Sequence, residues 1–219
     1  MTARDHARRM AQCCRQLAQQ GLIAGQDGNL SVRLSPSRIL VTPSGLIKAL
    51  LEPADMVQVD PRGRKRAGRH NPTSELDLHL RILERRPDVM AVVHAHPPYA
   101  TGFTVAGREI DRLVLPELIL SAGRVPLVPF GVPGTPELGE RVVPYIDDHD
   151  ALLLANHGAV TVGPTLDLAW IRMESLEHAA RILFTAHLLG RVNPLPEDAV
   201  KLLDARRAQS GGAGGMTGV

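Results

Sequence analysis

Hydrophobic residues recur every three or four positions in three long segments, which is the spacing that places them on one face of an α-helix. The pattern predicts helices over about residues 1–20, 73–86 and 165–190. A further capped helix is expected to begin near Thr135. Within the segment 73–86, the predicted apolar face consists of Leu76, Leu80 and Leu83.

Shorter hydrophobic runs lie between these helices and have the length and β-branched composition of strands. Two runs joined by a Ser-Pro-Ser turn predict a hairpin over 30–42, and an alternating run predicts a strand at 56–59. Strands interleaved with helices along one chain predict an α/β sandwich, with a helix layer on each side of a mixed sheet. Continuous apolar runs, typical of strands buried on both faces, occur at 89–93, 127–128, 151–155 and 159–162.

The domain organisation is expected to be simple. The sequence contains no internal repeat and no segment with the composition of an interdomain linker, so we expect one domain over residues 1–208. Residues 209–219 are rich in glycine and lack the hydrophobic residues needed to bury surface, which predicts a disordered tail.

Composition and charge exclude several classes of protein. The 219 residues carry 25 Lys or Arg against 23 Asp or Glu, so the charge is nearly balanced. The basic run at 62–69 is interpreted as a solvated loop, and we therefore expect no nucleic-acid partner. No apolar run is long enough to span a bilayer, and no signal-peptide core follows the first residues. Cys13 and Cys14 are too close together for a disulfide framework, so we expect a soluble protein of the reducing cytoplasm.

The distribution of histidine is the most informative feature of the composition. The chain has 9 His but only 1 Trp, 2 Tyr and 3 Phe. His94 and His96 end a buried strand two residues apart, so their side chains project from the same face, and His157 stands in the same setting after another buried strand. A His-x-His pair alone is more often a pair of satisfied polar residues, but three imidazoles at two strand ends form the ligand set of a catalytic zinc-type site. The other histidines, including His79, are interpreted as surface residues or as residues without a catalytic role.

Glu75 opens the helix that precedes the histidine strand. The free N–H groups and positive dipole of a helix N-terminus allow the same turn to present this carboxylate and to hold an anion. Taken alone, Glu75 is better interpreted as an ordinary acidic residue of a first helical turn, with Thr73 or Ser74 as the N-cap.

Five motifs together resemble the class II aldolase/adducin family over about residues 5–205. They are Gly25-x-x-Gly28-Asn29-Leu-Ser-Val-Arg, Ile39-Leu-Val-Thr42-Pro-Ser44-Gly45, Thr73-Ser74-Glu75, Val93-His94-Ala-His96 and Asn156-His157-Gly158. The resemblance implies a three-layer α/β/α sandwich around a mixed, largely antiparallel sheet. It also implies a homotetramer with the active site between subunits.

The resemblance assigns roles to individual residues. His94, His96 and His157 correspond to the metal ligands, and Glu75 corresponds to the catalytic glutamate. The resemblance implies one divalent ion per subunit, with Zn²⁺ expected first and Mn²⁺ or Co²⁺ as alternatives. Glu117 stands where a well-known aldolase of the family has a proton-donating tyrosine from the neighbouring subunit; its alternative interpretation is a surface helix residue after a proline. Gln26 replaces a phosphate-binding threonine. The residues that correspond to the phosphate site are Asn29, Ser44, Gly45, Thr73 and Ser74, a set without lysine.

The implied activity is that of a metal-dependent carbon–carbon lyase. It would cleave a ketose 1-phosphate reversibly to dihydroxyacetone phosphate and an aldehyde through a metal-stabilised enediolate. A decarboxylase of a 3-keto-4-phospho sugar acid, a sugar-phosphate dehydratase and an epimerase remain alternatives, although a glutamate rather than an aspartate at position 75 disfavours the epimerase. A non-enzymatic, adducin-like interaction module is disfavoured because the metal ligands are present.

Two further alternatives depend on cationic residues. A Schiff-base aldolase needs a lysine of depressed pKa, and Lys48, Lys65 and Lys201 do not lie in apolar strands, so a covalent mechanism is rejected. A decarboxylase would need a cation for the substrate carboxylate, and the candidates Arg124 and His70 are better interpreted as solvated loop residues.

Overall fold

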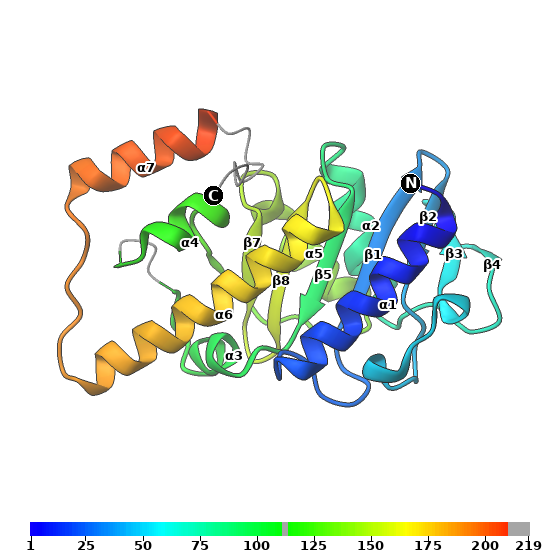
Figure 1. Cartoon of the computed structure of the whole chain (residues 1–219), viewed down its shortest axis with the longest axis horizontal. Coiled ribbons are helices and arrows are strands. Elements are labelled where there is room, and N and C mark those ends of the chain that lie inside the picture. Colours follow the sequence, from blue (N-terminus) through cyan, green and yellow to red (C-terminus); the bar gives the residue numbers. More distant parts are fainter. Residues whose placement is uncertain (111–113, 210–219) are drawn as a thin grey trace.

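The computed structural model describes residues 1–110 and 114–209 (Figure 1). Its central feature is one 8-stranded sheet with the order β4-β3-β2-β1-β5-β8-β7-β6. All neighbouring strands are antiparallel except β6 and β7, which are parallel. The predicted mixed, largely antiparallel sheet is therefore confirmed. The strands are β1 (Asn29–Ser35), β2 (Arg38–Val41), β3 (Val57–Val59), β4 (Lys65–Ala67), β5 (Ala91–Ala95), β6 (Leu127–Val128), β7 (Ala151–Leu154) and β8 (Gly158–Gly163).

Helices cover both faces of the sheet and give three layers. α1, α3, α4 and α6 share one hydrophobic cluster with residues such as Leu30 and Val93, whereas α2 and α5 share a second cluster with Val92 and Val160. Val92 and Val93 are neighbours in β5, and they enter different clusters because successive strand side chains point to opposite faces. The helices are α1 (Ala3–Gln19), α2 (Leu76–Arg85), α3 (Pro98–Val105), α4 (Pro116–Ser121), α5 (Pro136–Ile146), α6 (Leu166–Leu188) and α7 (Glu197–Gln209), with 3₁₀ turns η1 (Lys48–Leu50) and η2 (Pro53–Asp55).

Several local predictions need correction. α2 begins at Leu76 with Glu75 itself as the N-cap residue, and neither Thr73 nor Ser74 holds that position. Its buried face consists of Leu78, His79, Ile82 and Leu83 rather than of Leu76, Leu80 and Leu83. The basic run at 62–69 is solvent-exposed, as expected, but contains the short edge strand β4. Arg64 and Arg66 of this run both pair with Asp60.

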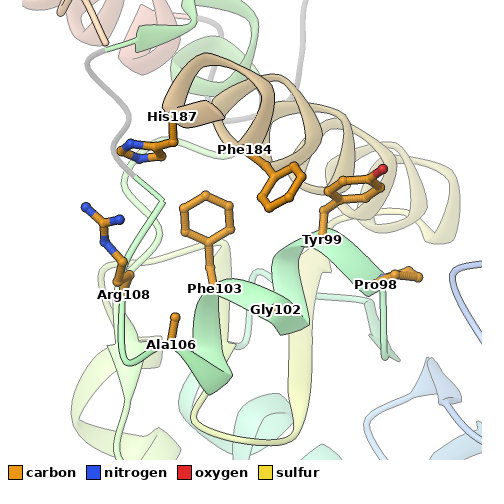
Figure 2. Close-up of a pocket in the computed structure, with 8 residues that line it drawn as sticks. All are labelled: Pro98, Tyr99, Gly102, Phe103, Ala106, Arg108, Phe184 and His187. Atoms are coloured by element: carbon orange, nitrogen blue, oxygen red, sulfur yellow. The ribbon is translucent and has the colours of Figure 1, made fainter. Parts of the chain in front are cut away.

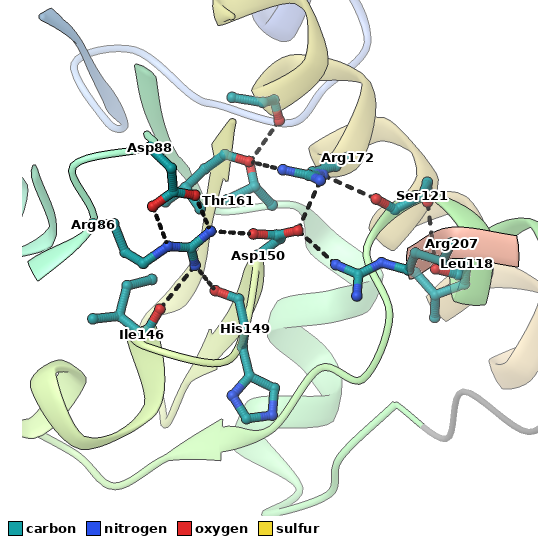
Figure 3. Close-up of polar contacts among 12 residues, drawn as sticks. Arg86, Asp88, Leu118, Ser121, Ile146, His149, Asp150, Thr161, Arg172 and Arg207 are labelled. Carbon is teal, nitrogen blue, oxygen red and sulfur yellow. Dashed lines mark hydrogen bonds and ion pairs between the residues drawn. The ribbon is translucent and has the colours of Figure 1, made fainter. Parts of the chain in front are cut away.

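Figure 3 shows a buried charge cluster at the start of β7. The Asp150 carboxylate is 7% exposed and accepts from Arg86 at 2.9 Å, Arg172 at 2.7 Å and Arg207 at 2.5 Å. Arg86 follows α2, Arg172 lies on α6 and Arg207 lies on α7. The Asp150 carboxylate therefore contacts arginines from elements on both faces of the sheet, α2 and α6, and from the C-terminal helix α7.

The C-terminal part of the chain is described up to Gln209, which ends α7. The predicted disordered tail otherwise falls on residues 210–219, outside the described residues. Across the described ranges, none of the helices combines the length and the apolar character needed to cross a membrane.

Candidate active site

Three histidines converge at one end of the central strands. His94 is fully buried in β5, His96 follows that strand, and His157 occupies the turn between β7 and β8. The Nε2 atoms of His94 and His96 lie 3.0 Å apart. One ligating nitrogen from each of the three rings lies within 4.8 Å of the other two. The structure therefore brings together the three residues that the sequence singles out as metal ligands.

The ring protonation of these histidines suits a metal site. Nδ1 of His94 lies 2.9 Å from the carbonyl oxygen of Ala159 and donates to it, which leaves Nε2 as the ligating atom. Burial alone would lower the pKa of His94, but the neighbouring Glu75 carboxylate raises it. Burial and the charge of His94 lower the pKa of His96, and the same causes lower the pKa of His157 to about 4. His96 and His157 are therefore neutral at neutral pH, the form in which imidazole binds a metal.

Glu75 faces this histidine cluster. Its Oε2 lies 3.2 Å from Nε2 of His94, and its Oε1 lies 3.4 Å from Nε2 of His157. Burial alone would raise the pKa of Glu75, but the His94 charge and the Asn29 amide hold it well below its usual range, so the group is a carboxylate. Among the described side chains, Oε1 of Glu75 and Nδ1 of His157 are buried without a hydrogen-bond partner. Three facing ring nitrogens beside a carboxylate oxygen that lacks a hydrogen bond fit a divalent cation.

The local sequence around His157 explains how two strands approach so closely. Asn156 has a φ of 55°, a left-handed conformation that Asn tolerates better than most residues. A Cβ at Gly158 would lie 2.5 Å from the carbonyl oxygen of Ala95 and 2.7 Å from Cδ2 of His96. Only glycine allows β8 to lie this close to His96, so the Asn-His-Gly motif sets the geometry of the cluster.

A cavity of about 370 Å³ opens beside the cluster. Backbone hydrogen bonds from Ser44 to Asn71 and from Thr73 to Thr42 join the two loops that form its wall. All five residues that the resemblance assigns to phosphate line it, together with Glu75 and two of the histidines. The lining residues are Gln26, Asp27, Gly28, Asn29, Ser44, Gly45, Lys48, Thr73, Ser74, Glu75, His96, Pro133, Gly134 and His157.

Lys48 is a lining residue that the sequence interpretation missed. Its side chain is buried in η1, and Nζ donates to the carbonyl oxygens of Gln26 at 2.8 Å and Leu46 at 3.0 Å. Burial lowers the pKa of Lys48, although the residue does not lie in an apolar strand. The expected phosphate set contains no lysine, but the cavity that its residues line also includes Lys48, which lies beneath the loop that carries Gln26.

His79 is a second residue that the sequence interpretation misplaced. It is fully buried on α2 rather than exposed, because the true buried face of the helix is turned away from the predicted one. Its Nε2 lies 2.5 Å from Oδ1 of Asn29, and the Asn29 amide nitrogen donates to Glu75 at 2.7 Å. The side chain of Asn29 thus links His79 to Glu75, in addition to lining the cavity.

Glu117 lies in a different part of the molecule. It is exposed in the first turn of α4 and does not belong to the described lining of the 370 Å³ cavity. Within one chain, therefore, it is not brought together with Glu75 and the histidines. Arg124, one of the two candidate carboxylate partners, lies 3.9 Å from Glu109, and His70, the other, lies 3.0 Å from Asp55.

A second, apolar cavity lies between α3 and α6 (Figure 2). It has a volume of about 470 Å³, and Tyr99 and Phe103 of α3 face Phe184 and His187 of α6 across it. Among the described residues, its lining contains no carboxylate, so these residues do not supply a carboxylate acid–base group like Glu75.

Comparisons with known proteins agree with this geometry. The family model of the class II aldolase and adducin N-terminal domain matches residues 8–184. An L-fuculose phosphate aldolase of Methanococcus maripaludis is 35% identical over 169 residues, which cover 77% of this chain and 91% of that protein. A 3-oxo-tetronate 4-phosphate decarboxylase of Escherichia coli is 33% identical over 170 residues, covering 76% and 80% of the two chains.

The same agreement holds for solved structures. The crystal structure of YgbL from Escherichia coli superposes with a TM-score of 0.87 at 29% identity, and the match covers 92% of this chain and 99% of that one. The chain belongs to the class II aldolase and adducin N-terminal domain family. The family resemblance and the fold predicted from the sequence are both confirmed. The relatives in this family support an aldolase or lyase activity.

Proposed function

We propose that the protein is a divalent-metal aldolase that cleaves a ketose 1-phosphate reversibly to dihydroxyacetone phosphate and an aldehyde. The observation that carries the proposal is the meeting of His94, His96 and His157 with the Glu75 carboxylate beside an anion-type cavity. One ion per chain, Zn²⁺ first and Mn²⁺ or Co²⁺ as alternatives, would be held by the three imidazoles. Such an ion supplies Lewis-acid stabilisation for negative charge on the substrate's carbonyl and hydroxyl oxygens.

Each part of the cavity has a task in this proposal. The hydroxyls of Ser44, Thr73 and Ser74 bind the phosphate, and Lys48 adds positive charge below them. Gly45 has a φ of 71°, which turns its loop at the cavity wall. Glu75 holds or moves the proton at the carbon atom that becomes nucleophilic.

The retro-aldol step fixes where protons and electrons go. A base removes the proton of the hydroxyl on C4, the C3–C4 electron pair passes to C3, and the aldehyde leaves. The three-carbon fragment is the enediolate of dihydroxyacetone phosphate, and Glu75 protonates it at C3. Glu117 of a neighbouring copy, or water, handles the proton on the aldehyde oxygen.

A second candidate is supported by the relative that decarboxylates 3-oxo-tetronate 4-phosphate. Loss of carbon dioxide from such a four-carbon keto acid leaves its electron pair on C2, and this fragment is again the enediolate of dihydroxyacetone phosphate. The two reactions therefore differ in the group that leaves but share the protonation step assigned to Glu75. Dehydratase and epimerase outcomes start from related enediolates and are the less favoured alternatives. An adducin-like role without catalysis is disfavoured by the intact histidine set.

We further propose a homotetramer with the site between subunits. The two helices that line the apolar cavity also carry exposed apolar side chains: Val105 on α3 is 62% exposed and Leu188 on α6 is 73% exposed, and Leu189, directly after α6, is 82% exposed. Such a surface suits contact with a second copy of the chain. Contact between copies would also bring Glu117 to a site that lacks it within one chain. The two free, buried cysteines accord with a cytoplasmic location.

The proposed function is tested with substrates of both kinds. The purified protein, loaded in turn with Zn²⁺, Mn²⁺ and Co²⁺, is incubated with a panel of ketose 1-phosphates and with a 3-oxo-tetronate 4-phosphate. Dihydroxyacetone phosphate, aldehyde and carbon dioxide are then measured. Dihydroxyacetone phosphate with an aldehyde supports the aldolase, and dihydroxyacetone phosphate with carbon dioxide supports the decarboxylase. Release of no dihydroxyacetone phosphate from any of them would overturn both.

A further inference from the structure

A chain of buried hydrogen bonds reaches Glu75 from the side opposite the histidine cluster. Ser31 Oγ lies 2.7 Å from Nδ1 of His79. Nε2 of His79 lies 2.5 Å from Oδ1 of Asn29, and Nδ2 of Asn29 lies 2.7 Å from Oε2 of Glu75. Ser31 and His79 are fully buried, and Asn29 is 5% exposed. Water therefore has little access to these bonds.

The orientation of the Asn29 amide fixes the direction of every bond in this series. The amide nitrogen of Asn29 lies against Oε2 of Glu75 and can only donate, so that oxygen accepts. Oδ1 of Asn29 then faces His79 and must accept, which requires a proton on Nε2 of His79. A neutral imidazole has one N–H, so Nδ1 accepts from the Ser31 hydroxyl. Each of the three bonds then has one donor and one acceptor in a single arrangement.

The positions of the four residues follow from two elements. Glu75 and His79 are four residues apart across the start of α2 and lie on the same face of the helix. Asn29 and Ser31 are two residues apart in β1 and point to the same face of the sheet. The packing of α2 against β1 therefore brings the four hydrogen-bonded side chains together.

We propose that His79 is a positioning residue for Glu75, which it orients by fixing the amide orientation of Asn29. The proposal rests on the function proposed above. Without the N–H of His79, the Asn29 amide can rotate by half a turn and present its oxygen to the Glu75 carboxylate, where two acceptors repel. Glu75 then leaves the position from which it protonates the enediolate.

The burial of His79 favours this role. Burial, reinforced by the charge of His94, lowers the pKa of His79 to about 3. The imidazole is therefore neutral throughout the range of ordinary assays, and it offers the single N–H that the bond to Asn29 requires. A protonated ring would lose the acceptor that Ser31 uses.

The test measures proton transfer by Glu75 without the unidentified second product. Dihydroxyacetone phosphate is incubated with metal-loaded protein in D₂O, and deuterium incorporation at its hydroxymethyl carbon is followed by NMR. We expect His79→Leu to lower the maximal exchange rate by about 10- to 100-fold, with half-saturation changed by less than about 3-fold. His79→Gln retains an N–H donor and is expected to restore most of the rate. The matched control is His178→Leu, at an exposed position of α6, which should exchange at the wild-type rate.

Metal content and unfolding temperature are measured on the same samples. One ion per chain in His79→Leu, with a slow exchange that Gln restores, supports the positioning role. An exchange rate equal to wild type in His79→Leu would overturn the positioning role. The role would also be overturned if His79→Leu and His79→Gln lost exchange activity and bound metal to the same extent. If His79→Leu does not fold, unchanged exchange in Ser31→Ala overturns the role, and a 3- to 10-fold loss, about 0.7–1.4 kcal/mol, supports it. Absence of exchange in the wild-type protein would instead overturn the proposed function itself.

Discussion

Oε2 of Glu75 lies 3.2 Å from Nε2 of His94, although the two residues are 19 positions apart and belong to a helix terminus and a strand. This contact places an acid–base group at the edge of a three-histidine cluster. In the proposed function, Glu75 would therefore be close enough to an ion held by the histidines to act on the carbon atom next to a metal-bound substrate oxygen.

Gly158→Ala should disturb the histidine cluster directly. The added Cβ would lie 2.5 Å from the carbonyl oxygen of Ala95 and 2.7 Å from the ring of His96, so β8 or His96 must move. We expect a loss of about 1–3 kcal/mol in the free energy of unfolding and weaker metal binding. Both are measured by denaturant titration and by metal analysis after dialysis. The control is Gly102→Ala on α3, where a Cβ meets nothing within 4 Å, and it should keep its metal. Equal metal affinity in the two variants would contradict this reading of the Asn-His-Gly motif.

Lys48→Met should weaken anion binding. The substitution removes a buried ammonium group beneath the loops that line the cavity and leaves the carbonyl oxygens of Gln26 and Leu46 without their donor. Since hydrogen bonds to charged groups contribute about 1.5–3 kcal/mol, we expect at least roughly a 10-fold rise in the half-saturation concentration of dihydroxyacetone phosphate. Lys201→Met, at an exposed position of α7, is the control and should bind normally.

The same lysine allows the covalent alternative to be checked. Because Lys48 lines the cavity and burial lowers its pKa, it is the described lysine best placed to form a Schiff base. We expect borohydride with dihydroxyacetone phosphate to leave the mass and activity of the protein unchanged. A reduced adduct on Lys48 would show that the covalent mechanism had been rejected wrongly.

Asp150→Ala should destabilise the fold. The carboxylate is the shared partner of Arg86, Arg172 and Arg207, and Arg172 is 1% exposed. Burial lowers the pKa of Arg172 to about 10, which still leaves it charged at neutral pH. Removing one partner of a buried ion pair leaves the other charge uncompensated, so we expect a loss of about 3–5 kcal/mol in the free energy of unfolding. Asp148→Ala, at an exposed position, should stay within about 0.5 kcal/mol of wild type. Similar losses in both variants would contradict the importance of the cluster.

The two cysteines should be unreactive in the folded protein. Cys13 and Cys14 are buried on α1, and burial raises the pKa of Cys14 to about 12 and that of Cys13 well above its usual range. Because the thiolate is the reactive form, a chromogenic disulfide reagent should label neither residue until guanidinium unfolds the chain. Rapid labelling of the native protein would show that α1 does not pack as described.

Local patterns in the sequence predicted the layers of the fold and the three histidines that meet at the candidate site. His94, His96 and His157 could be identified because polar residues at the ends of buried apolar strands are unusual, and strand ends meet at one edge of a sheet. That Glu75 lies beside this cluster could be predicted only from the family resemblance, because an acidic residue in the first turn of a helix is common.

The remaining site residues depend on contacts that a local pattern does not encode. His79 was missed because α2 is hydrophobic on more than one side, and the face that packs is Leu78, His79, Ile82 and Leu83. The i, i+4 spacing of Glu75 and His79, with the i, i+2 spacing of Asn29 and Ser31, was the signal that could have found the hydrogen-bonded chain. Lys48 was missed because its ammonium group is buried against two backbone carbonyl oxygens, those of Gln26 in another loop and of Leu46 just before its own turn. No pattern in the sequence around Lys48 indicates these contacts.

Deuterium exchange before and after metal removal tests the central claim most directly. Dihydroxyacetone phosphate in D₂O is treated with protein as purified, with protein stripped by a chelator, and with the stripped protein given back Zn²⁺, Mn²⁺ or Co²⁺. Glu75→Gln, purified in the same way, controls for contaminating isomerase activity. The account predicts exchange that is lost with the metal, returns with it, and is absent in Glu75→Gln. Exchange that persists in the chelator-treated protein and in Glu75→Gln, or no exchange with any metal, would contradict it.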